Sequence, residues 1–255
     1  MTPTPPRTAL VTGGAQRLGR AIALALAADG WDVAVHYHGS QDSALATVAE
    51  IQALGRRAHC VQHDLDSPGD MTPLLEACEA VLGPVHCLVN NASLFEHDTA
   101  ASFTLAAFEA HMRTNVAAPV RLALALHDRL PADSRGVVIN LLDQKLWNPN
   151  PDFLSYTLSK AALESATGLL ARALAPQVRV VGVAPGITLP ARGQTDAGFA
   201  AAHRATPLGR GSTPDDIAAA VVFLAKAPAV TGTTLLVDGG QHLVPTTRDI
   251  MFLTS

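Results

Sequence analysis

The sequence predicts a single doubly wound α/β domain of the Rossmann type, in which helices flank a parallel sheet of about seven strands. Three observations favour this fold class. Short apolar runs alternate with longer helical patterns from one end of the chain to the other. The short runs are apolar throughout, as in strands that are buried on both faces. No linker, repeat or low-complexity segment divides residues 1–255, so one large domain is expected.

Each expected element is defined by its apolar pattern and by the residues at its ends. The seven expected strands are Thr8–Val11, Trp31–His36, Ala58–Gln62, Cys87–Val89, Gly136–Leu142, Val178–Val183 and Thr234–Val237. The six expected helices are Leu18–Ala28, Ser43–Leu54, Met71–Leu82, Val116–Arg129, Ser155–Leu174 and Asp215–Ala225. Ser67-Pro68 and Thr213-Pro214 each place a capping hydroxyl before a proline and predict helix starts. Gly30 and Gly55 stand where helices are expected to end.

Composition limits the possible partners and location of the protein. Hydrophobic residues make up 48% of the chain and aromatic residues only 4%, which predicts a core of Ala, Val, Leu and Ile. A net charge of −4 argues against binding to nucleic acid or to anionic membranes. The start, Met1–Arg7, is not organised like a signal peptide, and no apolar run approaches the roughly 20 residues of a membrane span. We therefore expect a cytoplasmic protein.

The cysteines and histidines carry no sign of a metal site. Cys60, Cys78 and Cys87 have neither paired nor metal-type spacing and are expected to be reduced core thiols. The ten histidines are scattered, without a His-x-x-x-His pair on one expected helix beside carboxylates. We predict no bound metal.

A glycine-rich turn, Thr12–Arg20, follows the first expected strand and leads into a helix. Glycines permit a tight turn and let backbone amides approach a pyrophosphate, and the helix N-terminus adds partial positive charge. Within a strand–helix–strand unit such a turn predicts a dinucleotide site. The alternative is a plain connection between a strand and a helix.

The end of the second strand indicates which dinucleotide binds. Enzymes that use NAD usually have an acidic residue there, which bonds the ribose hydroxyls. This chain has His36-Tyr37-His38-Gly39-Ser40 instead, with Arg17 and Arg20 in the turn nearby. The lack of a carboxylate and the available donors favour the 2′-phosphate of NADP(H). The alternative is a neutral surface turn.

Tyr156 and Lys160 are four residues apart at the start of a long expected helix, so they should project from one face. A cation beside a phenol stabilises the phenolate and lowers the pKa of the tyrosine. Such a tyrosine can donate or accept a proton near neutral pH. The pair is common by chance, so its meaning depends on the motifs around it.

Taken together, the motifs resemble those of the short-chain dehydrogenase/reductase family, from Thr8 to about Leu243. The matching motifs are Thr12–Arg20, Asn90-Asn91-Ala92, Asn115 at a helix start, Tyr156 with Lys160, Pro185-Gly186 and Val237-Asp238-Gly239-Gly240. The resemblance implies that Asn115, Tyr156 and Lys160 are catalytic, that Lys160 holds the nicotinamide ribose, and that Asn115 supports a proton-relay water. It also implies a homotetramer.

Two residues depart from the pattern of that family. Arg17 stands where the turn usually has a glycine, and Asp143 stands where a serine usually precedes the tyrosine by thirteen residues. The serine donates a hydrogen bond to a substrate carbonyl, whereas an ionised aspartate cannot donate and would repel the oxyanion of a reduced ketone. Asp143 therefore favours a nitrogen heterocycle with N–H donors, and it should keep Tyr156 protonated. The alternatives are a degenerate site or an aspartate turned away.

Both departures resemble the pteridine reductase branch of the family, which includes bacterial dihydromonapterin reductases. The segment His36-Tyr37-His38-x-Ser40 resembles its 2′-phosphate loop, Asn91-Ala92-Ser93-x-Phe95 its pterin shelf, and Leu141-Leu142-Asp143 the segment before its tyrosine. One mismatch is Gly39, where trypanosomatid members have arginine. The branch implies NADPH-dependent reduction of a C=N bond in a pterin-like ring, dihydropterin to tetrahydropterin, with Tyr156 as proton donor.

The resemblance carries two sets of site residues. The expected cofactor-binding residues are Gly13, Arg17, Leu18, Gly19, His38, Ser40, Asp64, Leu65, Asn91, Ala92, Ser93, Lys160, Pro185 and Gly186. The expected substrate-binding residues are Arg17, Ser93, Phe95, Asp143 and Tyr156, with Phe95 stacking on the ring. Trp147 and Phe153, between Asp143 and Tyr156, are further candidates to flank the substrate.

Two segments near the C-terminal end of the chain carry expectations of their own. The least patterned stretch, Pro190–Gly211, is a candidate lid over the ligand crevice. The tail Gln241–Ser255, with apolar Ile250 to Leu253, is expected to pack on its own domain or on a neighbouring subunit.

A generic NADP(H)-dependent carbonyl reductase or alcohol dehydrogenase remains an alternative function. A non-catalytic NADPH-binding sensor is a further one, against which the intact Asn115, Tyr156 and Lys160 argue.

Overall fold

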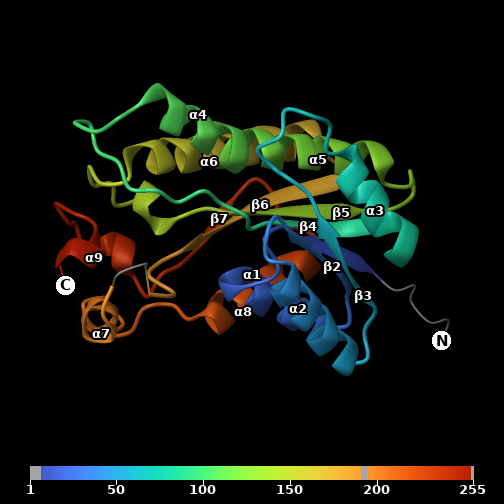
Figure 1. The fold of residues 1–255 in the computed structure, drawn as a ribbon, viewed down its shortest axis with the longest axis horizontal. Helices are drawn as coiled ribbons and strands as arrows, with labels where there is room; N and C mark the ends of the chain where they lie inside the picture. The colour runs from blue at the N-terminus through green and yellow to red at the C-terminus, as the bar shows by residue number, and fades with distance from the viewer. Residues whose placement is uncertain (1–6, 191–193, 254–255) are drawn as a thin grey trace.

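A parallel sheet forms the centre of the computed structural model, which describes residues 7–190 and 194–253 (Figure 1). Its strands are β1 (Thr8–Val11), β2 (Asp32–Tyr37), β3 (Ala58–Gln62), β4 (Val85–Asn90), β5 (Gly136–Leu141), β6 (Val178–Pro185) and β7 (Thr234–Val237). They lie in the order β3-β2-β1-β4-β5-β6-β7, with every neighbouring pair parallel. The order reverses between β1 and β4, so a ligand crevice is expected outside the carboxyl ends of these strands.

Helices cover both faces of the sheet (Figure 1). One face carries α1 (Arg17–Ala28), α2 (Gln41–Ala53) and α8 (Pro214–Lys226), and the other carries α3 (Thr72–Leu82), α5 (Ala118–Arg129) and α6 (Leu154–Ala173). A π-helical turn, Arg113–Ala117, joins α4 (Leu105–Met112) to α5. The short helices α7 (Asp196–Arg204) and α9 (Ile250–Leu253) lie near one another at the end of the molecule where the C-terminus is. This arrangement confirms the predicted fold class.

The two larger hydrophobic cores of the molecule are mainly aliphatic, as the composition predicts. Alternate residues of β1 point to opposite faces: Ala9 and Val11 pack in the core under α1, α2 and α8, and Leu10 packs in the core under α3, α5 and α6. All three side chains are fully buried. A buried Leu or Ile contributes roughly 1.5–3 kcal/mol, so these continuous apolar strands drive the layered packing.

Most expected element boundaries agree with the structure, and Thr213 closes a capping box at the start of α8. The prediction of a helix start at Ser67-Pro68 is wrong. The Ser67 hydroxyl accepts a hydrogen bond from Gly69 N, which closes a turn, and α3 begins later at Thr72 with a proline in its first turn. Gly30 and Gly55 do follow the ends of α1 and α2.

The placement of Asn115 at a helix start is also wrong. Asn115 lies inside the π-helical turn, in the middle of the continuous helical segment from α4 to α5. The error arises because α4 was not predicted: its apolar residues do not form a clear stripe, and only His111 of this helix is buried.

The following observations apply to the part of the chain that the structure describes. Cys60, Cys78 and Cys87 are free, and Cys78 and Cys87 are buried. Within 7–190 and 194–253, no helix has the length and apolar character required to cross a membrane, and no group of three or more His, Cys, Asp or Glu side chains is arranged to hold a metal. Most of Met1–Arg7, residues 191–193 of the candidate lid and residues 254–255 of the tail lie outside the described residues.

Candidate active site

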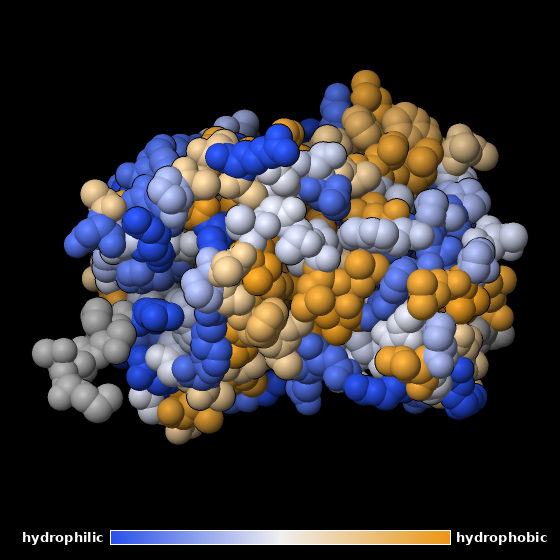
Figure 2. Space-filling view, turned by 180° about the vertical axis from the view of Figure 1, so that it is seen from behind, coloured by the Kyte–Doolittle hydropathy of each residue, from blue (hydrophilic) through white to orange (hydrophobic). Residues whose placement is uncertain are grey.

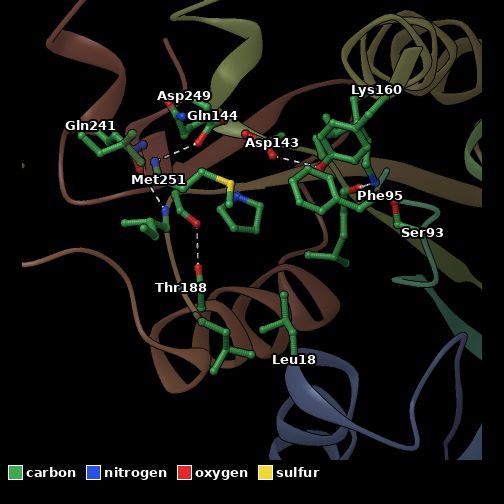
Figure 3. A pocket seen from close by; sticks show the side chains of 18 of the residues that line it. Leu18, Ser93, Phe95, Asp143, Gln144, Lys160, Thr188, Gln241, Asp249 and Met251 are labelled. Atoms are coloured by element: carbon green, nitrogen blue, oxygen red, sulfur yellow. Dashed lines mark hydrogen bonds between the residues drawn. The ribbon is translucent and has the colours of Figure 1, made fainter. Parts of the chain in front are cut away.

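A cavity of about 480 Å³ opens at the carboxyl ends of the central strands (Figure 3). Segments that follow different strands meet there: Arg17 and Leu18 after β1, Ser93 and Phe95 after β4, Leu142, Asp143 and Gln144 after β5, and Pro185, Gly186 and Thr188 at the end of β6 and just beyond. Tyr156 and Lys160 enter from the first turns of α6. The site therefore lies at the edge that the topology predicts.

Asp143, Tyr156 and Lys160 form the polar centre of this cavity. The Tyr156 hydroxyl donates a hydrogen bond to Asp143 Oδ2 at 2.9 Å. The other oxygen, Asp143 Oδ1, accepts from Lys145 N at 2.8 Å, which fixes the carboxyl plane. Lys160 Nζ lies 5.6 Å from the centre of the Tyr156 ring and donates to Leu141 O at 2.7 Å. Asp143 therefore faces the tyrosine and is not turned away.

Burial controls the protonation of these three groups. It raises the pKa of the Asp143 carboxyl, and it raises the pKa of Tyr156 well above its usual value, with the adjacent Asp143 as the second cause. Burial also lowers the pKa of Lys160 to about 8. The expectation that Lys160 lowers the pKa of Tyr156 is thus wrong, because burial and Asp143 outweigh the lysine. The expectation that Asp143 favours a protonated tyrosine agrees with the structure.

Asn115 holds the segment after β4 against α6. Its side-chain oxygen accepts from Leu94 N at 2.7 Å, and its amide donates to Leu94 O and Ser159 Oγ, both at 2.9 Å. The side chain is buried and engaged in these contacts. The surrounding π-helical turn is a feature often found at functional sites, because it leaves the regular hydrogen-bond ladder of the helix.

The glycine-rich turn has no room for side chains at its centre. A Cβ on Gly19 would lie 2.1 Å from Gly13 O, and Gly13 has a φ of +61°. Gly13 N donates to His36 Nδ1 at 3.1 Å, while His36 Nε2 donates to His63 O at 3.0 Å. Burial lowers the pKa of His36 to about 4, so the ring stays neutral and its Nδ1 can accept. The turn is held open for a backbone-bound phosphate group, which fits a dinucleotide.

Arg17 occupies a left-handed backbone position, with a φ of +50°. This conformation costs a non-glycine residue about 1 kcal/mol or more, which explains why a glycine is the usual residue here. The side chain is exposed, lines the cavity and donates from Nη2 to Pro190 O at 2.9 Å. Arg17 therefore connects the phosphate turn with the segment after β6.

The remaining cofactor candidates lie around the turn. Asn91 donates from its side chain to Thr12 O at 2.9 Å and to Gly13 O, and Ala92 N donates to Thr12 Oγ1. Both residues thus support the turn. His38 and Ser40 lie at the end of β2, and Asp64 and Leu65 lie beyond the end of β3. These four do not line the cavity of about 480 Å³ and lie farther along the same edge of the sheet.

Phe95 is the aromatic side chain most available to a ligand. It is 49% exposed and lines the cavity. One neighbour, Phe153, stacks on it with ring centres 4.4 Å apart, and Tyr156 meets it edge-on at 4.7 Å. Phe153 is buried, and neither it nor Trp147 lines the cavity, so the structure does not place these two candidates against a ligand.

The C-terminal tail contributes cavity residues that sequence reasoning missed. Asp249, Ile250 and Met251 line the cavity, as does Gln241 at the start of the tail (Figure 3). The described part of the tail contacts its own domain, through Asp152 and Asn148. The only sequence signal was the apolar run that follows Asp249. In the candidate lid, residues 196–204 form α7, and Leu189 and Gln194 border the cavity.

Several known proteins resemble this chain in sequence or in structure. Residues 13–242 match the family model described as enoyl-(acyl carrier protein) reductase. FolM alternative dihydrofolate reductase 1 from Brucella suis, solved with NADP, is 40% identical with a TM-score of 0.90, covering 95% of this chain and 98% of that chain. The protein of the same name from Brucella canis, also solved with NADP, is 40% identical with a TM-score of 0.88. The match covers 96% of this chain and 97% of that chain. The 3-oxoacyl-(acyl-carrier-protein) reductase FabG of Staphylococcus epidermidis is 31% identical over 93% of this chain and 99% of its own length.

Proposed function

The chain belongs to the short-chain dehydrogenase/reductase family, and from this premise we propose that it reduces a C=N bond in a pterin-like ring, dihydropterin to tetrahydropterin. It is an NADP-dependent oxidoreductase, as are the solved relatives that carry this cofactor. The pterin-like substrate is supported by the site itself and by the dihydrofolate reductase names of the two Brucella relatives.

The hydrogen bond from Tyr156 to Asp143 carries the proposal. It places an acceptor-only carboxylate where a ketone reductase needs a donor for the substrate oxygen. A charge that develops on a carbonyl oxygen would meet a negative group, which disfavours the transition state. A heterocycle avoids this penalty, because its N–H groups donate to the carboxylate, and its imine nitrogen takes up a proton as the ring carbon takes up hydride, which leaves a neutral amine.

The cofactor site fits NADPH in its donors and its open turn. The glycine turn would hold the pyrophosphate, and Arg17, His38 and Ser40 would hold the 2′-phosphate, since residues 36–40 include no carboxylate. Lys160 would hold the nicotinamide ribose, and Asp64, Leu65, Asn91, Ala92, Ser93, Pro185 and Gly186 would line the rest. When bound, NADPH supplies the hydride for the ring carbon.

The chain's own residues supply the matching proton. Tyr156 stays protonated at neutral pH, because its pKa is raised, and its hydroxyl donates to the ring nitrogen next to the carbon that is reduced. Asp143 accepts the hydrogen bond of the tyrosine hydroxyl, and its carboxylate, whose pKa is also raised, can take up a proton from solvent and pass it to Tyr156 after each turnover. Asn115 fixes the segment that bears Ser93 and Phe95, and Phe95 offers a ring face to the heterocycle.

A carbonyl reductase is the second candidate, and the FabG relative favours it. The test is NADPH oxidation by purified protein with 7,8-dihydrobiopterin and 7,8-dihydromonapterin, against a panel of ketones. We expect turnover of the dihydropterins to exceed that of every ketone. Turnover of ketones alone would contradict the proposal, and tight NADPH binding without any turnover would favour the sensor.

We also propose a homotetramer, as the family resemblance implies. Exposed apolar side chains lie on two separate parts of the molecule: Leu124, Leu158 and Leu169 on α5 and α6, and Phe223 and Leu235 on α8 and β7. Figure 2 shows apolar areas of this kind between hydrophilic ones on one face. Such patches are typical of subunit contacts. Light scattering on the eluted protein measures the assembly directly.

A further inference from the structure

The C-terminal tail is fastened over the cavity by a buried carboxylate. Asp152, which is 1% exposed, accepts from Arg248 Nε at 2.8 Å and from Asp249 N at 2.8 Å. The Arg248 guanidinium is the main reason that the pKa of Asp152 is lowered to about 2, so this carboxyl is ionised at neutral pH. Asn148 Nδ2 also donates to Val244 O at 2.7 Å. These contacts fix the position of the next residue, Asp249.

Asp249 brings a second carboxylate to the cavity. In Figure 3 it lies on the same side as Gln144 and Asp143, and Met251 extends its sulfur toward the middle. Asp249 Oδ1 accepts from Met251 N and Oδ2 accepts from Lys145 Nζ, both at 3.2 Å. Each carboxylate oxygen can accept more than one hydrogen bond, so acceptor capacity remains on this side chain.

The charge of Asp249 is directed at the ligand space. Its partner Lys145 is only 3% exposed and does not line the cavity, so the lysine ammonium lies behind the carboxylate. The negative charge of Asp249 also reaches the reaction centre, where it contributes to the raised pKa values of Asp143 and Tyr156. Among the described residues, the two cations that line the cavity, Arg17 and Lys160, are assigned to the cofactor.

The position of Asp249 determines which part of a substrate it meets. The reacting C=N bond must lie at Tyr156, which donates the proton. Asp249 belongs to the tail, across the cavity from Ser93 and Phe95 (Figure 3). A ring held at Phe95 and Tyr156 would therefore extend its substituent, and not its reacting bond, toward Asp249. A carboxylate there accepts hydrogen bonds from hydroxyl or N–H groups and repels another carboxylate.

We propose that Asp249 is a specificity-determining residue that favours substrates with an uncharged, hydroxyl-bearing substituent and disfavours substrates whose substituent carries carboxylates. This inference rests on the proposed function for the ring itself. It predicts that dihydromonapterin and dihydrobiopterin, which carry polyol chains, are preferred over dihydrofolate, which ends in a glutamate.

The test compares kcat/KM for 7,8-dihydromonapterin and 7,8-dihydrofolate in the natural protein and in Asp249→Asn. Asparagine has nearly the same shape and keeps one acceptor oxygen, which can serve either Lys145 Nζ or Met251 N, but it removes the charge. We expect the ratio to shift by about tenfold toward dihydrofolate in the variant, mainly through KM. In the natural protein, kcat/KM for dihydrofolate should rise with salt, because salt screens the repulsion.

Two control variants separate charge from tail position. Asp133→Asn removes the same charge from an exposed loop that precedes β5, at the opposite edge of the sheet, and should leave the ratio unchanged. Arg248→Ala loosens the tail but leaves Asp249 charged, and it should raise both KM values alike. An unchanged ratio in Asp249→Asn, or the same shift in Arg248→Ala, would overturn the inference.

The role of Asp249 can still be tested if pterins are not substrates at all. In that case the same variants are compared on a neutral keto ester and on the corresponding keto acid. A shift of the ratio toward the keto acid in Asp249→Asn supports the role of Asp249 while the pterin proposal fails. An unchanged ratio on both substrate pairs shows that Asp249 only fastens the tail.

Discussion

Asp143 Oδ2 lies 2.9 Å from the Tyr156 hydroxyl and accepts its hydrogen bond, so the group beside the proton donor is a carboxylate. The resemblance to the short-chain family would place a serine at this position. The exchange replaces a donor by an acceptor and adds to the rise in the tyrosine pKa that burial causes. Both effects suit protonation of a ring nitrogen better than stabilisation of an oxyanion.

The cofactor preference is tested by His38→Asp. An added carboxylate at the end of β2 should repel the 2′-phosphate of NADPH and bond the ribose hydroxyls of NADH. We expect KM for NADPH to rise by about tenfold or more and KM for NADH to fall. The neutral variant His38→Asn is the control and should show a smaller rise. An unchanged KM for NADPH would place the 2′-phosphate elsewhere.

Lys160→Met should stabilise the protein while it removes activity. Burial lowers the pKa of Lys160 from 10.5 to about 8, so the folded state carries an unfavourable buried charge at neutral pH. One pKa unit corresponds to about 1.4 kcal/mol, and Leu141 O loses its donor in the variant, so we expect a net gain of about 1–2 kcal/mol at pH 7. Urea unfolding measures this difference.

The sign of the pH dependence distinguishes that explanation from a packing effect. Between pH 8 and about 10 the natural protein loses the Lys160 proton in the folded state but keeps it in the unfolded state, so its stability rises relative to the variant. The advantage of Lys160→Met should therefore shrink over this range. A constant difference between the two proteins would show that the buried charge is not its source.

Asp152→Asn should loosen the C-terminal tail. The lowered pKa of Asp152, about 2 against an ordinary 3.8, means that the carboxylate stabilises the folded state above about pH 4 and loses this effect as the pH falls toward 2. We expect a loss of about 1–2 kcal/mol at pH 7 that largely disappears at pH 2. A loss that does not change with pH would contradict the ion pair with Arg248.

Much of the fold could be predicted because buried parallel strands and amphipathic helices leave strong periodic patterns. The glycine turn, Asp143, Tyr156 and Lys160 could be found because each depends on neighbours close in sequence or on a fixed spacing. The structure then brings Arg17, Ser93 and Phe95 into the same cavity as these residues. The helix start at Ser67 was misjudged because a serine hydroxyl can cap a turn as well as a helix.

The rest of the site depends on contacts between distant parts of the chain. Asp249 reaches the cavity through bonds to Lys145 and Asp152, which lie about a hundred residues earlier in the sequence. No local pattern records such a contact. The raised pKa of Tyr156 could be predicted only in part: the sequence indicates the effect of Asp143, but burial, which is the larger cause, depends on the fold.

The most direct test of the central claim is kcat/KM for 7,8-dihydrobiopterin and for a ketone, measured with NADPH in the natural protein and in Asp143→Ser. Serine restores the donor that ketone reduction requires and removes the carboxylate that orients the heterocycle. We expect pterin turnover to fall by about a hundredfold, with ketone turnover retained or increased. Pterin turnover that survives unchanged in Asp143→Ser would contradict the role assigned to the aspartate.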